Sequence, residues 1–221
     1  MKKILFGFSF LIAGLAPPLR AESERFYAFW SEYFQAMHLG HWATVVDVNG
    51  RRPVVDLVLA LDAQRQKLND SREILLSHRT EPIPEARRAV EGLLNGLEMY
   101  SLCNAADLDA VNRMNDRWEL AQRLDGRRDE RREALEVMAA SALLLRQSLY
   151  ERPEAGTDRR RKSSLRPRFS PEEAASLWKQ LTLLFGEDLA KGGAGASPLL
   201  ASVEELRKSL RGISRDEKKS P

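Results

Sequence analysis

Apolar side chains recur at helical spacing along most of this chain. The first stripe lies in residues 26–37, at positions i, i+3, i+4, i+7, i+8 and i+11. Its members are Phe26, Phe29, Trp30, Tyr33, Phe34 and Met37. This spacing gathers them on one face of an α-helix, with Ser31, Glu32 and Gln35 turned away, and predicts that they are buried against neighbouring helices.

Residues 44–55 are compatible with two structures. In the first, the helix continues to the Asn49-Gly50 pair, and Val45 and Val48 join its apolar face. In the second, Asn49-Gly50 is the two-residue turn of a β-hairpin between β-branched runs. Pro53 favours the helix, because a proline cannot donate to a strand ladder but suits the first turn of a following helix.

The amphipathic pattern returns in residues 53–78, in residues 85–103 with their continuation 104–124, and in residues 127–151. The predicted inward residues are Val54, Leu57, Val58, Leu61, Leu68 and Leu75, then Ala86, Val90, Leu93, Leu94 and Leu97, then Leu108, Val111 and Trp118, and finally Leu135, Met138, Ala142, Leu145 and Leu149. Long amphipathic segments joined by short breaks predict an all-α protein, with an antiparallel helical bundle of four or five helices in residues 22–152.

The composition changes after residue 152. Residues 153–169 contain six basic side chains, prolines, a glycine and few apolar residues, which predicts a flexible basic linker. Ser170, Pro171 and Glu173 then mark a helix start, because they combine a hydroxyl N-cap, a proline in the first turn and the carboxylate of a capping box. We predict a C-terminal helical hairpin over residues 170–213 and a disordered tail at 214–221.

The first 21 residues have the order of a secretory signal peptide. Lys2 and Lys3 precede an apolar run at 4–16, and Ala21 offers a cleavage position before an acidic stretch. The run is shorter than the roughly 20 residues that cross a bilayer, and no later segment is apolar enough to do so. We therefore predict a periplasmic or secreted protein. An uncleaved anchor is the alternative, because Leu19 is a less favourable residue near a cleavage site.

Removing this segment changes the charge balance. The whole chain has a formal net charge of +3, but residues 22–221 hold 32 basic and 32 acidic side chains. Residues 22–152 hold 18 Lys/Arg against 22 Asp/Glu, and residues 153–221 hold 14 against 10. Neither part has the basic excess typical of nucleic-acid-binding domains, so no nucleic-acid partner is predicted.

Residues suited to catalysis are sparse. The sequence contains no G-x-S-x-G, P-loop, Rossmann glycine pattern or H-E-x-x-H. Asp107 and Asp109 project from different faces of a helix, which makes them poor acid–base partners. Residues 125–133, DGRRDERRE, predict a solvated helix with local ion pairs. Cys103 is the single cysteine; its apolar surroundings predict a buried thiol, with pairing between chains as the alternative.

The aromatic-rich opening segment also holds two histidines. His38 and His41 are three residues apart on one helix, a spacing that some metal-binding bundles use. A stable metal site needs three or four ligands, however, and the remaining histidine, His78, ends a different helix. The primary prediction is therefore a packed aromatic core without a cofactor, and the alternative is a metal- or haem-binding periplasmic bundle that uses His38 and His41.

These patterns favour a non-enzymatic protein that acts by contact with another envelope protein, in an adaptor, assembly or chaperone-like role. The basic linker is suited to an acidic partner or to lipid headgroups at a membrane surface. The candidate partner-binding residues are Arg159, Arg160, Arg161, Lys162 and Trp178. We predict no transmembrane anchor after cleavage of the signal segment, and peripheral contact with a membrane remains compatible with the sequence.

Overall fold

The computed structural model describes residues 17–44, 53–151, 165–192, 195 and 197–215. Within them lie seven helices: α1 (Pro17–Thr44), α2 (Val54–Ser77), α3 (Pro84–Arg113), α4 (Arg117–Gly126), α5 (Arg128–Gln147), α6 (Pro171–Gly192) and α7 (Pro198–Arg215). The prediction of an all-α fold is confirmed. Most of residues 44–55, for which a helix and a hairpin were weighed, lies outside the described residues.

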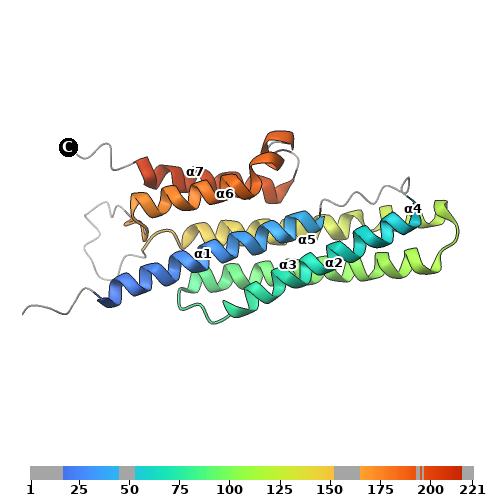
Figure 1. Cartoon of the computed structure of the whole chain (residues 1–221), viewed down its shortest axis with the longest axis horizontal. Helices are drawn as coiled ribbons and strands as arrows, with labels where there is room; N and C mark the ends of the chain where they lie inside the picture. Colours follow the sequence, from blue (N-terminus) through green and yellow to red (C-terminus); the bar gives the residue numbers. More distant parts are fainter. Residues whose placement is uncertain (1–16, 45–52, 152–164, 193–194, 196, 216–221) are drawn as a thin grey trace, which may run out of the picture.

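Four long helices, α1, α2, α3 and α5, lie side by side in an elongated bundle (Figure 1). The α6–α7 hairpin lies along one half of this bundle, where α6 contacts α1 and α7 contacts α5. The short helix α4 lies at the opposite end, between α3 and α5. The hairpin therefore shares the core of one half and leaves the other half uncovered.

The aromatic stripe of α1 is the centre of this core, as predicted. Trp30, Tyr33, Phe34 and Met37 are completely buried, and they pack with apolar residues of α2, α3, α5, α6 and α7. The hydroxyl of Tyr33 lies 2.8 Å from that of Ser141 on α5, so this buried polar group has a partner. The density of rings near the start of the chain is thus explained by packing.

Met138 of α5 packs against two glycines, Gly96 of α3 and Gly40 of α1, and this lets the helices approach closely. A Cβ atom on Gly96 would lie 2.5 Å from Met138 Cγ and 3.0 Å from the carbonyl oxygen of Ala134. A Cβ atom on Gly40 of α1 would lie 2.8 Å from Met138 Cε. Met138 therefore occupies space at the junction of three helices that any larger residue at these glycines would need.

The predicted continuous stripe of residues 104–124 is interrupted. The helix α3 ends at Arg113, and α4 begins after Asp116, whose carboxylate accepts hydrogen bonds from the backbone N–H groups of Trp118 (2.7 Å) and Glu119 (3.1 Å). This N-cap restarts the helix in a new register. The prediction that Trp118 faces inward is wrong, since its side chain is 69% exposed.

The start of α6 has the predicted capping box. The backbone N–H of Glu173 donates to Ser170 Oγ at 3.2 Å, and the backbone N–H of Ser170 donates to Glu173 Oε2 at 2.9 Å. Just before it, the last residues of the basic segment pair with the end of the bundle, because the backbone N–H of Arg168 donates to the carbonyl of Leu149 at 2.8 Å. The Phe169 ring is buried and stacks on Phe26, with centroids 5.1 Å apart.

The predicted signal segment lies outside the described residues except for 17–21, which form the first turn of α1. Over the described part of the chain, none of the helices combines the length and the apolar character needed to cross a bilayer.

Candidate functional site

The two histidines of α1 lie at the contact with α6. His41 is 4% exposed, and its Nε2 lies 3.4 Å from Oδ2 of Asp188. His38 Nε2 accepts a hydrogen bond from the indole N–H of Trp42, one turn further along the helix. The Phe185 ring lies against both imidazoles, with centroids 5.2 Å and 5.8 Å away. The predicted pair therefore meets one carboxylate and one aromatic ring of α6.

The third histidine belongs to a different contact. His78 Nε2 lies 2.6 Å from Oε2 of Glu32 on α1. Among the residues that the structure describes, no group of three or more His, Cys, Asp or Glu side chains is placed to hold a metal ion. Because a stable metal-ion site needs three or four ligands, the two histidines of α1 and Asp188 do not form such a site by themselves.

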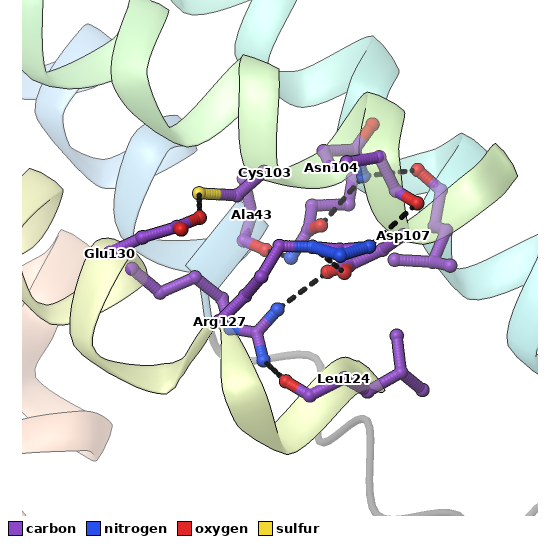
Figure 2. A network of polar contacts seen from close by, with 11 residues as sticks. Ala43, Cys103, Asn104, Asp107, Leu124, Arg127 and Glu130 are labelled. Carbon is purple, nitrogen blue, oxygen red and sulfur yellow. Dashed lines mark hydrogen bonds and ion pairs between the residues drawn. The ribbon is translucent and has the colours of Figure 1, made fainter. Parts of the chain in front are cut away.

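A buried charged network, shown in Figure 2, links α3 with the start of α5. The carboxylate of Asp107 on α3 is 2% exposed; Arg127 Nε donates to Oδ1 at 3.0 Å, and Arg131 Nη1 donates to Oδ2 at 2.6 Å. Each guanidinium also donates to a backbone carbonyl: Arg127 to that of Ala106 at 2.9 Å, and Arg131 to that of Leu124. The two arginines thus join α3, the end of α4 and the start of α5.

A second set of hydrogen bonds continues the network toward α1 and α2. Asn104 Nδ2 donates to Gln64 Oε1 at 2.7 Å and to the carbonyl oxygen of Leu61 at 3.0 Å. Gln64 Nε2 donates to the carbonyl oxygen of Ala43 (Figure 2). Both amide side chains are buried, so these bonds satisfy polar groups that water does not reach and fix the register of three helices.

The chemistry of this network is structural. Burial raises the pKa of Asp107, and the guanidinium groups of Arg131 and Arg127 oppose that shift. Both carboxylate oxygens accept charge-assisted hydrogen bonds, which hold the side chain in one orientation. Both oxygens of Asp107 are therefore occupied by hydrogen bonds from arginines, so the carboxylate is not free to exchange a proton with a substrate.

Cys103 lies beside the network and is 5% exposed, as predicted for a buried thiol. Its Sγ lies 3.8 Å from Oε2 of Glu130. Burial raises the pKa of the Cys103 thiol, and the negative charge of Glu130 raises it further. Since the thiolate is the reactive form, this environment opposes nucleophilic chemistry at Cys103.

The half of the bundle beyond the hairpin, which comprises residues 53–65 and 99–136, is called here the uncovered end. It bears four large apolar side chains that are 63–69% exposed. They are Val55 and Leu59 on α2, Leu102 on α3 and Trp118 on α4. A small separate core in the same half, which includes Leu61, Val111 and Leu124, holds α2, α3 and α4 together.

An open cleft of about 710 Å³ lies next to α4. Met114, Glu119, Arg123, Arg127 and Glu130 are among its lining residues. Two basic and two acidic side chains in this set give a mixed surface without a strong charge of either sign. The cleft is thus part of the uncovered end rather than a closed pocket for a small charged ligand.

The predicted partner-binding residues are only partly described. Residues 159–162, the run of three arginines and a lysine, lie outside the described residues. Trp178 is half-buried on α6 and packs on the shared core. The guanidinium carbons of Arg207 and Arg211 on α7 each lie 5.9 Å from its ring centroid. Its visible contacts therefore join the two helices of the hairpin.

Comparison with known proteins adds no relative: no protein-family model, no curated protein and no solved structure matches this chain.

Proposed function

We propose that this is an exported, non-enzymatic helical protein that acts by protein–protein contact in the bacterial envelope, in an adaptor, assembly or chaperone-like role. The contact surface is the uncovered end, and the partner is an envelope protein that presents an apolar surface. The observation that supports this most strongly is the exposure of Val55, Leu59, Leu102 and Trp118 on that half of the bundle.

The apolar side chains at this end are the kind that stabilise protein interfaces. Tryptophan is among the residues enriched at binding hot spots, and burying exposed apolar surface drives association. Trp118 lies on a helix whose start is capped by Asp116 and whose end is bound by Arg131. Because the backbone of this helix is already fixed, a partner that covers Trp118 has to order only its side chain.

The charges around this end favour a protein over a nucleic acid or an anionic membrane. The uncovered end holds eight Lys/Arg and eleven Asp/Glu. Several of its arginines pair within the chain, such as Arg113 with Asp109 at 2.6 Å and Arg128 with Asp125 at 2.9 Å. A polyanion binds an excess of basic side chains, and this surface has the opposite balance.

The proposal is tested by capture from a detergent extract of the native envelope, with the purified full-length protein as bait. We expect a discrete partner whose recovery falls about tenfold or more in the Trp118→Asp and Leu102→Asp variants, because a charge in the interface core costs several kcal/mol. The matched control is Leu183→Asp, which places the same charge at an 85% exposed leucine of the hairpin. Equal recovery with all three variants would refute the assignment of this surface.

Elemental analysis and an absorption spectrum of the native protein separate this proposal from the cofactor alternative. A contact protein is expected to show neither a stoichiometric metal nor a haem band. A metal or haem that is lost in the His38→Ala or His41→Ala variant would favour the alternative.

A further inference from the structure

The contact between α1 and α6 changes character along its length. Near the start of α6 the polar contacts are neutral: the hydroxyls of Tyr27 and Ser176 lie 2.6 Å apart, and Gln180 Nε2 donates to Ser31 Oγ at 2.6 Å. Near the end of α6 the contact is made by His38 and His41 of α1 with residues 184–188, a region called here the histidine seam. Among the described residues of this contact, groups that titrate near neutral pH occur only in its second half.

The hydrogen bonding of His38 requires a neutral imidazole, and His41 is buried. His38 Nε2 accepts the indole N–H of Trp42, and an acceptor nitrogen cannot carry a proton of its own. The same imidazole forms a hydrogen bond with the backbone of Leu184 on α6. Both ring nitrogens of His41 are buried without a hydrogen-bond partner, and Nε2 lies 3.4 Å from Oδ2 of Asp188. Protonation of His38 at Nε2 would break its hydrogen bond with the indole N–H of Trp42.

Within the part of the chain that the structure describes, the charges facing the seam cannot neutralise two protonated imidazoles. On α2, Lys67 lies over the Trp42 ring at 5.1 Å from its centroid and contributes one positive charge. On α6, Asp188 contributes one negative charge. On α3 and α5, the neighbours of this turn at Gly40 are the uncharged side chains of Leu97 and Met138. Among the described residues, the imidazoles thus face one charge of each sign at neutral pH, because Glu187 is exposed and pairs with Lys191 at 3.4 Å. Acid adds as many as two positive charges.

We propose that the histidine seam is an acid-sensitive latch, which holds the second half of α6 against α1 when His38 and His41 are neutral and releases it when they are protonated. The first half of α6 stays in place, because its hydrogen bonds with α1 do not involve titrating groups. This inference concerns the hairpin and does not depend on the proposed partner surface.

The pKa values of His38 and His41 are both shifted downward, which is the direction that release in acid requires. Burial lowers the pKa of His41 below its ordinary value, although Asp188 opposes the shift. Burial also lowers the pKa of His38, and the charge of His41 lowers it further. A histidine whose pKa is lower in the docked state binds fewer protons there, so docking is strongest above the ordinary pKa of about 6.5 and weakens as the pH falls below it.

The test is amide hydrogen exchange of the full-length protein at about pH 7.5 and about pH 5, with rates corrected for intrinsic pH dependence. We expect the protection of residues 184–191 to fall by about tenfold or more at the lower pH, since one unit of pKa corresponds to a factor of ten. Protection of residues 173–181 is expected to change by less than about twofold.

The double variant His38→Gln, His41→Gln is expected to lose this pH response, and His78→Gln, which removes a histidine outside the seam, is expected to retain it. Unchanged or increased protection of residues 184–191 in acid would overturn the proposal, as would a wild-type response in the double variant. Should the double variant not fold, NMR titration of the wild-type protein decides: the proposal requires the His41 imidazole to titrate below about 6.5, and titration at or above that value overturns it.

Discussion

Replacing Asp107 by asparagine removes one charge from the network at the uncovered end and keeps the shape of the side chain. Arg127 and Arg131 would then remain, each 16% exposed, without the carboxylate that both of them contact. Asparagine can still accept one hydrogen bond, but it does not offset two positive charges. The substitution therefore removes the negative charge and one of the two charge-assisted hydrogen bonds between α3 and α5, with little change in side-chain volume.

The expected cost follows from the burial of the groups. Removing one partner of a buried ion pair destabilises a protein by about 3–5 kcal/mol, because the remaining charge is desolvated and unpaired. Both arginines here retain some contact with solvent and their bonds to backbone carbonyls, so we expect a loss of about 2–4 kcal/mol in the free energy of unfolding. The matched control is Asp109→Asn, which breaks the exposed pair with Arg113 and is expected to cost less than about 0.5 kcal/mol.

Urea unfolding followed by circular dichroism measures both variants. With a slope of about 2 kcal/mol per molar urea, Asp107→Asn is expected to lower the midpoint by about 1–2 M, and Asp109→Asn by less than about 0.3 M. Equal midpoints for the two variants would refute the reasoning, because it assigns the difference entirely to burial.

Four further substitutions test other parts of the fold. Gly96→Ala is expected to lower the free energy of unfolding by about 1–3 kcal/mol, because its Cβ would lie 2.5 Å from Met138 Cγ. Gly212→Ala, whose Cβ would have no neighbour within 4 Å, is expected to raise the free energy of unfolding by about 0.5–1 kcal/mol. Thermal unfolding compares the two variants. Ser170→Ala removes the N-cap of α6 and is expected to cost about 1 kcal/mol in the same assay, and an unchanged value would mean that the capping box contributes nothing. Asp188→Asn removes the group that opposes the lowered pKa of His41, so the loss of α6 protection at about pH 5 is expected to exceed that of the wild type, and a smaller loss would contradict this sign.

The periodicity of apolar residues is sufficient to predict the all-α class, because a helix with one buried face has apolar residues every three or four positions along the sequence. The aromatic residues of α1 recur every three or four positions, and Trp30 and Phe34 are completely buried as that spacing predicts. The start of α6 was also predictable, since Ser170 and Glu173 interact with each other's backbone within a single turn. Both features depend on residues close together in the chain.

The buried network could not be predicted in the same way, because its partners are distant in sequence. Residues 125–133 have the composition of a solvated helix, and Arg128 and Arg132 do pair locally with exposed carboxylates. Arg127 and Arg131 instead contact Asp107, 20 and 24 residues earlier. The spacing of four between these arginines places them on one helix face, but a sequence does not state which face meets α3.

The burial of two aromatic residues, Trp118 and Phe169, is not predicted correctly by sequence periodicity, because each lies in or just after a segment that joins two helices. Trp118 continues the spacing of the preceding stripe, yet the new helix that starts after Asp116 turns it outward. Phe169 stands in a basic segment with no periodicity, yet it is buried against Phe26 and Trp30. In both cases the outcome depends on how the chain re-enters the bundle, which local spacing does not specify.

The proposal that the uncovered end is the contact surface is tested most directly by photo-crosslinking in living cells. A benzophenone amino acid is placed at Trp118 in one strain and at Leu183, the exposed hairpin position, in another. The proposal predicts a discrete crosslinked protein from position 118 and none from position 183. Crosslinks from position 183 alone, or from neither position, would contradict it.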